Sequence, residues 1–225
     1  MKRYAGLLYR ALNPVYARDP LSGRGAELYG GRFNPKGTPA LYASRSPVTA
    51  LREANQVGTL QPTTLVAYDA DIAPVFDIRE ADALSAFGMS EADLGAATWR
   101  DEMIENGESK TQIFARRLIA EGYAALLFPS FARGAPHNAL NLVLWRWTSA
   151  PPTKLVLVDD ENRLQNSYVR EQGEAMNGRQ RESPAELSID CLTLESAFTF
   201  LLTDLLTYGK GHRRGVWPKA GLFGQ

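Results

Sequence analysis

Two nearly continuous apolar segments, residues 124–128 and 140–147, most constrain what this chain can fold into. A strand that is apolar at successive positions is buried on both faces, so both segments are expected to be central strands of a sheet. Further strands are expected at residues 7–11, 40–43, 64–71, 75–78 and 154–158. These strands flank a helical middle, which predicts an α+β fold with a mixed sheet that is bent or split.

Helix signals are clear at several positions. Ser46 and Pro47 supply an N-cap and a proline at the first helical position, so a helix is expected from there to about Val57. Further helical segments are expected at residues 80–87 and 109–121, with a turn capped by Ser90 between them and Gly122 at the end. The Gly-, Pro- and Arg-rich residues 13–39 are expected to form a long ordered loop.

The composition changes at Asp159, which predicts a domain at 1–159 and a polar linker at 160–182. Ser183, Pro184 and Glu186 then predict the start of a helix, followed by a basic tail that ends at residue 225. Its apolar residues follow at alternating spacings of four and three: Leu187, Cys191, Leu194, Phe198, Leu201, Leu205 and Tyr208. This stripe is expected to pack on the domain, form a homodimer or dock a partner.

The chain carries 25 Lys and Arg against 25 Asp and Glu, and this balance argues against a nucleic-acid coat or a protein of anionic membranes. The balance hides a split, because residues 1–60 carry a net charge of +6 and residues 61–160 carry −6. The single Cys191 excludes an intramolecular disulfide, and His137 and His212 are too isolated to form a zinc site, so no metal is expected.

The first residues, MKRYAGLLYRALNP, have a basic start but an apolar stretch too short for a signal peptide. No segment approaches the roughly 18 apolar residues of a membrane span. We therefore expect a cytoplasmic protein.

The sequence contains none of the common nucleotide-binding, zinc-protease or hydrolase motifs: GxGxxG, GxxxxGK[ST], HExxH, CxxC or GxSxG. A serine hydrolase built on Ser130 and His137 would need a nucleophile elbow, which the residues around Ser130 do not form. What remains is a set of polar residues in or beside apolar elements: Arg10, Arg32, Tyr42, Glu53, Ser130, His137, Asn138 and Asn141.

These residue types suit one kind of ligand. The planar guanidinium groups of Arg10 and Arg32 could grip a diphosphate, and Gly30-Gly31 would let the backbone approach it. A tyrosine ring offers a flat surface to a heterocycle. A carboxylate can hydrogen-bond ribose hydroxyls and stabilise an oxocarbenium-like centre. Together they favour a dinucleotide whose N-glycosidic bond is broken.

Each residue also has a purely structural interpretation. Arg10 could face solvent on an edge strand, Arg32 could cap its loop, and Tyr42 could be core. Ser130 could cap the turn after its strand, and His137 could be a loop or core hydrogen bonder. Glu53 could lie on a solvated helix face, but at 100° per residue it points about 140° away from Val48. It is therefore expected to lie off the Val48/Leu51 stripe, which should face the core, and to line a cleft floor.

Several blocks, taken in order, resemble the RES-domain family, the toxins of RES–Xre toxin–antitoxin pairs, and within it the ParT-like members. The resemblance covers about residues 4–158. Its blocks are Tyr9-Arg10, residues 30–42 (GGRFNPKGTPALY), residues 50–53 (ALRE), Pro129-Ser130 and residues 141–145 (NLVLW). The loop before Asn141 departs from the family pattern, which leaves no role assigned to His137.

The resemblance implies a fold similar to ADP-ribosyltransferase catalytic domains and an activity that consumes NAD⁺. It places the family's catalytic triad on Arg32, Tyr42 and Glu53, with Arg10, Ser130 and Asn141 as further NAD⁺-binding residues. It also implies an Xre-family antitoxin that blocks the active site.

For the reaction, the resemblance implies transfer of ADP-ribose to a protein, with phosphoribosyl pyrophosphate synthetase as the candidate acceptor. Hydrolysis or phosphorolysis of NAD⁺ is the alternative. A second alternative is a non-enzymatic binding module that acts through the helix at 187–208.

Overall fold

The structure is a computed structural model that describes residues 2–55, 61–80 and 82–164. The expected C-terminal helix, its apolar stripe and the basic tail lie outside the described residues, as does most of the expected linker.

Six strands form one mixed sheet, as the sequence predicts. They are β1 (Lys2–Leu12), β2 (Leu41–Ser44), β3 (Thr64–Asp77), β4 (Ala125–Pro129), β5 (Leu140–Leu144) and β6 (Thr153–Leu157). Their order is β1-β2-β5-β4-β3-β6, and β1 also pairs with β3, so the first five strands named in this order close into a circuit. Within it β3 and β4 run parallel and the other pairs are antiparallel.

The long strand β3 bends the sheet. Tyr68 pairs with both β1 and β6, whereas the C-terminal residues Val75–Asp77 pair with β4. The expectation of two separate strands at 64–71 and 75–78 is therefore wrong. Pro74 lacks an N–H but does not end the strand, because its carbonyl oxygen accepts a hydrogen bond from the Ala124 amide at 2.9 Å.

Alternating side chains of the strands build two apolar clusters. The inner cluster lies inside the circuit and includes Leu142 and Leu144 of β5. The outer cluster includes Val143 and Trp145 together with Phe114 and Leu118. Because β5 is buried on both faces, its sequence is apolar at nearly every position, and the prediction that β4 and β5 are buried is confirmed.

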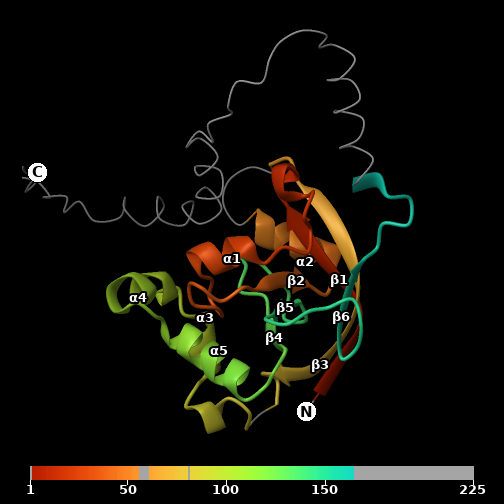
Figure 1. Cartoon of the computed structure of the whole chain (residues 1–225). Coiled ribbons are helices and arrows are strands. Elements are labelled where there is room, and N and C mark those ends of the chain that lie inside the picture. Colours follow the sequence, from red (N-terminus) through yellow and green to blue (C-terminus); the bar gives the residue numbers. More distant parts are fainter. Residues whose placement is uncertain (1, 56–60, 81, 165–225) are drawn as a thin grey trace, which may run out of the picture. The chain divides into compact units, whose positions relative to one another are not determined.

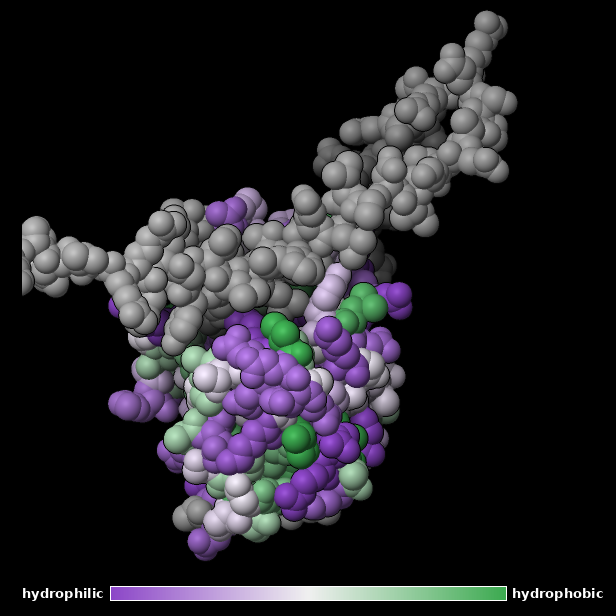
Figure 2. Space-filling view, turned by 90° about the vertical axis from the view of Figure 1, so that its left-hand side faces the viewer, coloured by the Kyte–Doolittle hydropathy of each residue, from purple (hydrophilic) through white to green (hydrophobic). Residues whose placement is uncertain are grey.

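Five α-helices are described: α1 (Arg24–Tyr29), α2 (Pro47–Ala54), α3 (Glu91–Gly95), α4 (Trp99–Asn106) and α5 (Lys110–Ala120). Figure 1 shows α3, α4 and α5 on one side of β4 and β5, with β1, β3 and β6 on the other. Viewed from the side of these helices, the surface is mostly hydrophilic with isolated hydrophobic residues (Figure 2). The helices thus turn their apolar faces to the outer cluster, as Phe114 and Leu118 of α5 do.

The predicted caps are confirmed at Ser46 and Ser90, whose side chains accept main-chain hydrogen bonds. Ser109, predicted only as the start of a helical segment, caps α5 in the same way. Two other expectations are corrected. Helix α2 ends at Ala54 rather than near Val57, with Asn55 as its C-cap. In place of a helix at 80–87, the described residues there hold only a 3₁₀ turn at Ser85–Phe87.

The loop expected at 13–39 contains a 3₁₀ turn, Pro14–Tyr16, and helix α1. Helix α1 begins after Gly23 and has no side-chain N-cap, so its start lacks the usual sequence signals of a helix N-terminus. Packing fixes it instead, because Asn34 Nδ2 donates to the Ala26 carbonyl oxygen at 2.8 Å and the Gly37 amide donates to that of Glu27 at 2.8 Å.

Candidate active site

Helix α2 carries Glu53 and packs mainly against β1. Its buried residues are Thr49 and Ala50, which precede Glu53 by four and three positions and so lie on the same face. Val48 is 63% exposed, so the expectation that Val48 faces the core is wrong. The small side chains of Thr49 and Ala50 occupy the packed face instead, and they bring the half-buried Glu53 over the sheet.

Glu53 accepts two short hydrogen bonds on a single oxygen. Ser130 Oγ donates to Glu53 Oε1 at 2.5 Å, and Asn141 Nδ2 donates to the same atom at 2.6 Å. Hydrogen bonds to a carboxylate are shorter and stronger than those between neutral groups. They fix where this carboxylate lies and how it is oriented.

The strand register explains why these residues meet. Pro129 at the end of β4 pairs with Leu140 at the start of β5, so Ser130 and Asn141 lie at the same end of the sheet. Ser44 at the end of β2 pairs with Asn141, and α2 follows β2 almost directly. Three chain segments therefore converge on Glu53 through backbone pairing.

Ser44 is a member of this cluster that sequence reasoning missed. Its hydroxyl donates to Asn141 Oδ1 at 2.7 Å, and both side chains are buried. The available signal was weak: Ser44 follows Tyr42 by two positions and so shares its face of β2.

Tyr42 is held by its hydroxyl group. The Tyr42 hydroxyl donates to Asn34 Oδ1 at 2.8 Å and accepts from the Phe33 amide at 3.0 Å. Burial raises the pKa of Tyr42, so the phenol stays protonated. The hydroxyl thus holds the segment that follows Arg32, and stacking of the ring on a heterocycle stays a prediction.

Buried amides lock the turn around Arg32. Gln112 Nε2 of α5 donates to the carbonyl oxygens of Gly31 at 2.9 Å and of Asn34 at 3.2 Å. Trp145 Nε1 donates to the Phe33 carbonyl oxygen at 2.8 Å. A Cβ atom at Gly31 would lie 2.6 Å from the Tyr42 hydroxyl oxygen, so this glycine permits close approach to a side chain of the protein itself.

Arg32 reaches from this turn to the C-terminal end of α3. Its Nη1 donates to the carbonyl oxygens of Leu94 at 2.9 Å and Ala96 at 2.7 Å. The guanidinium carbon lies 5.0 Å from the ring centre of Phe131 and 5.6 Å from that of Trp99. These contacts with carbonyl oxygens and aromatic rings orient the guanidinium.

The structure thus brings the predicted residues together to different degrees. Glu53, Ser130 and Asn141 touch directly, while Arg32 and Tyr42 share one turn. The two groups meet at Phe131, which follows Ser130 in the chain and packs under the Arg32 guanidinium.

Arg10 lies elsewhere. It shares the face of β1 with Leu8 and Leu12 of the inner cluster, whereas the residue that pairs with Ser44 is its neighbour Tyr9. Arg10 Nη1 donates to the carbonyl oxygens of Ser22 at 3.0 Å and Pro20 at 3.2 Å. The structure gives Arg10 this contact with the loop, and its binding of a phosphate stays a prediction. His137 is exposed in the loop before β5.

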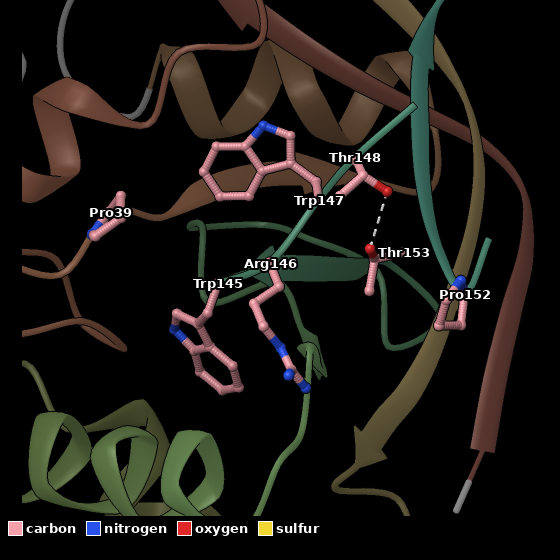
Figure 3. Close-up of a pocket in the computed structure, with 7 residues that line it drawn as sticks. All are labelled: Pro39, Trp145, Arg146, Trp147, Thr148, Pro152 and Thr153. Atoms are coloured by element: carbon pink, nitrogen blue, oxygen red, sulfur yellow. Dashed lines mark hydrogen bonds between the residues drawn. The ribbon is translucent and has the colours of Figure 1, made fainter. Parts of the chain in front are cut away.

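A surface hollow lies at the other end of β5 (Figure 3). It is lined by Pro39, Trp145, Arg146, Trp147, Thr148, Pro152 and Thr153. In Figure 3 the indole rings of Trp145 and Trp147 point away from each other, and they pack on the outer and inner clusters respectively. Four residues of extended strand, about 13 Å, separate Trp145 from Asn141, so the hollow is distinct from the Glu53 cluster.

Among the residues that the structure describes, no group of three or more His, Cys, Asp and Glu side chains could hold a metal ion. In the same part of the chain, every helix is too short or too polar to cross a membrane.

The sequence matches a known family of protein domains. A protein-family model described as the RES domain matches residues 7–165, well over half of the chain. The matched range contains the Glu53 cluster, Arg32, Tyr42 and Arg10. No curated protein matches the sequence.

Proposed function

The chain belongs to the RES-domain family, and from that premise we propose that it is a toxin that cleaves the nicotinamide–ribose bond of NAD⁺ and transfers the ADP-ribose to a protein. RES domains are associated with toxins that act on NAD⁺. The observation that carries the proposal is the Glu53 carboxylate, held by Ser130 and Asn141 at 2.5 and 2.6 Å where α2 meets the ends of β4 and β5.

In the proposed reaction, the bond between the nicotinamide nitrogen and the ribose anomeric carbon breaks, and its electron pair leaves with nicotinamide. The anomeric carbon becomes positively charged as this bond lengthens. An oriented carboxylate stabilises such charge and accepts a hydrogen bond from a ribose hydroxyl. A nucleophile then bonds to the same carbon and loses its proton.

The other site residues have supporting roles in this proposal. Ser130 and Asn141 orient Glu53 and contact the nicotinamide ribose. Arg32, oriented by carbonyl oxygens and aromatic rings, binds the diphosphate, and Tyr42 lies beside the nicotinamide. Arg10 holds the loop at residues 20–22 through its hydrogen bonds to the Pro20 and Ser22 carbonyl oxygens.

Glu53→Gln tests the site directly, because it keeps the size of the side chain and removes its charge. We expect NAD⁺ consumption to fall about 10²–10³-fold with the thermal unfolding temperature little changed. Glu80→Gln is the matched control, since Glu80 is an exposed carboxylate that pairs with Lys2. Equal turnover in the two variants would remove Glu53 from the mechanism.

The products identify the acceptor. With a lysate, protein transfer attaches ADP-ribose covalently to a protein, and phosphoribosyl pyrophosphate synthetase is the acceptor to examine first. Free ADP-ribose in phosphate-free buffer would instead indicate hydrolysis, and a phosphorylated ADP-ribose that requires phosphate would indicate phosphorolysis. Mass spectrometry separates these three outcomes.

A toxin of this kind needs a neutralising partner, and we propose an Xre-family antitoxin that blocks the Glu53 cluster. Expression of the wild-type chain should stop bacterial growth, and Glu53→Gln should allow it. Co-expression of the antitoxin should restore growth, and failure of an Xre-family protein to bind the purified chain would contradict this partner.

A further inference from the structure

The Ser44 hydroxyl is connected to the Glu53 carboxylate by two hydrogen bonds through the Asn141 side chain. It donates to Asn141 Oδ1 at 2.7 Å, and Asn141 Nδ2 donates to Glu53 Oε1 at 2.6 Å. Ser44 is 3% exposed and Asn141 is 6% exposed, so water does not substitute readily for either partner.

The direction of these bonds is fixed by chemistry. An amide oxygen only accepts hydrogen bonds and a carboxylate only accepts them, whereas a hydroxyl can donate. The carboxylate must therefore accept from the amide nitrogen of Asn141, which leaves Asn141 Oδ1 facing Ser44, whose hydroxyl donates to it. Rotated by 180°, Asn141 would put its oxygen against the carboxylate oxygen, and the two acceptors would repel each other.

We propose that Ser44 is a positioning residue, which holds the Asn141 amide in place by a hydrogen bond to its oxygen and through it holds the Glu53 carboxylate. The proposal rests on the proposed function, because it names a residue that prepares the same carboxylate. Ser44 touches Asn141 and acts on the reaction only through it.

A packing role alone would not require a hydroxyl here. Ser44 is buried where β2 pairs with both β1 and β5, and alanine is no larger than serine, so packing alone would accept either residue. The difference between serine and alanine at this position therefore measures the hydrogen bond to Asn141.

Ser44→Ala is tested in the full chain with Thr111→Val as the control. Thr111 is also buried and also loses a hydroxyl contact, to Ser109 at 3.0 Å, in helix α5. We expect Ser44→Ala to lower the kcat for nicotinamide release about 10–100-fold, the size of effect that small misplacement of a reacting group produces. KM for NAD⁺ should change less than about twofold, because the hydroxyl does not contact the substrate.

A double-mutant cycle separates this role from general destabilisation. In an Asn141→Ala background, Ser44→Ala should have no further effect on kcat, because the residue through which it acts is gone. An equal loss of kcat in both backgrounds would overturn the proposal, as would a Thr111→Val variant that loses as much kcat as Ser44→Ala.

A second measurement does not depend on turnover. The side-chain amide resonances of Asn141 are assigned in a nuclear magnetic resonance spectrum as those missing from Asn141→Ala. They should shift in Ser44→Ala and stay in place in Thr111→Val. Unchanged resonances in Ser44→Ala overturn the positioning role, whereas a wild-type chain that releases no nicotinamide contradicts the proposed function and leaves this result to stand.

Discussion

At the residue scale, hydrogen bonds from neighbouring residues fix the orientation of the Glu53 carboxylate. Both hydrogen bonds fall on Oε1 and come from different strand ends, so the carboxylate is tied to β4 and β5 although it belongs to α2. A charged group oriented before the substrate arrives needs little reorganisation during the reaction. This orientation is what Ser130, Asn141 and Ser44 provide.

Tyr42→Phe removes only the hydroxyl, and we expect a loss of about 1–3 kcal/mol in the free energy of unfolding. The reason is that Asn34 Oδ1 and the Phe33 amide both lose their partner while the ring keeps its packing. Urea unfolding measures the loss. An unchanged midpoint would show that these two hydrogen bonds do not hold the turn around Arg32.

At the element scale, the turn at Gly31–Asn34 carries Arg32 and is hydrogen-bonded to Gln112 of helix α5 and to Tyr42 of strand β2. Gly31→Ala would place a Cβ atom 2.5 Å from Asn34 Oδ1 and 2.6 Å from the Tyr42 hydroxyl oxygen, closer than real contacts allow. We expect a loss of stability of about 1–3 kcal/mol together with reduced NAD⁺ turnover, because the Tyr42–Asn34 hydrogen bond must break.

Gly25→Ala is the matched control for that change. A Cβ atom at Gly25 meets nothing within 4 Å, and Gly25 lies in α1. Alanine in a helix is favoured over glycine by about 0.5–1 kcal/mol, so this variant should be neutral or more stable. Comparable losses in Gly25→Ala and Gly31→Ala would show that the tight contacts at Gly31 are not the cause.

Asp77, at the end of β3, makes a pH-dependent contribution to the free energy of unfolding. Hydrogen bonds from Arg79, with the nearby Lys2 charge, lower the pKa of Asp77 to about 2. A pKa lowered by folding stabilises the protein above the unfolded value of about 3.9, and this contribution is lost as the pH falls from about 4 to 2.

Asp77→Asn should therefore be less stable than wild type at pH 7, and the gap should shrink toward pH 3. Its size at pH 7 is below about 2.5 kcal/mol, because the Arg79 side chain is half exposed and solvent weakens the pair. Urea unfolding at the two pH values measures the gap, and a gap that widens on acidification would contradict the sign.

Local patterns predicted the elements that they determine. Helix α5 was predicted from the helical segment at 109–121 that ends at Gly122, and β5 was predicted from its nearly continuous apolar sequence. Helix α1 was missed because contacts from Asn34 and Gly37 stabilise it, not its own sequence. Strand β3 was predicted as two strands because the sequence suggests a break at Pro74. The hydrogen bond that the Pro74 carbonyl oxygen accepts there comes from the amide of residue 124, which is distant in the sequence.

The site residues show the same difference between what the local sequence determines and what distant contacts determine. The polar types of Glu53, Ser130 and Asn141 singled them out, and their contacts confirm that they lie together. Ser44 was missed because its partner is 97 residues away in the sequence, and only the pairing of β2 with β5 brings them together.

At the scale of the whole molecule, the net charge of +6 over residues 1–60 does not gather at one site. Lys2 forms ion pairs with Asp77 and Glu80, and Arg3 forms one with Asp71. Part of the positive charge of residues 1–60 is therefore paired with acidic residues of the segment 61–160. Arg32, a positive charge from this segment, is linked to the Glu53 cluster through its contact with Phe131.

Deletion of residues 165–225 tests where the activity resides. The family match ends at residue 165, and Leu164 packs against the inner cluster, so the deletion should leave that cluster intact. We expect NAD⁺ turnover within about threefold of the full chain, since the residues assigned to catalysis all precede Leu164. Loss of turnover in a truncated chain that still unfolds cooperatively would favour a working role for the C-terminal segment.

The most direct test of the central proposal is the release of free nicotinamide when the purified full-length protein is incubated with NAD⁺. The site predicts that nicotinamide appears mole for mole as NAD⁺ disappears, because the bond broken is the one at the anomeric carbon. Intact NAD⁺ after prolonged incubation of the folded protein with a lysate, or loss of NAD⁺ without free nicotinamide, would contradict it.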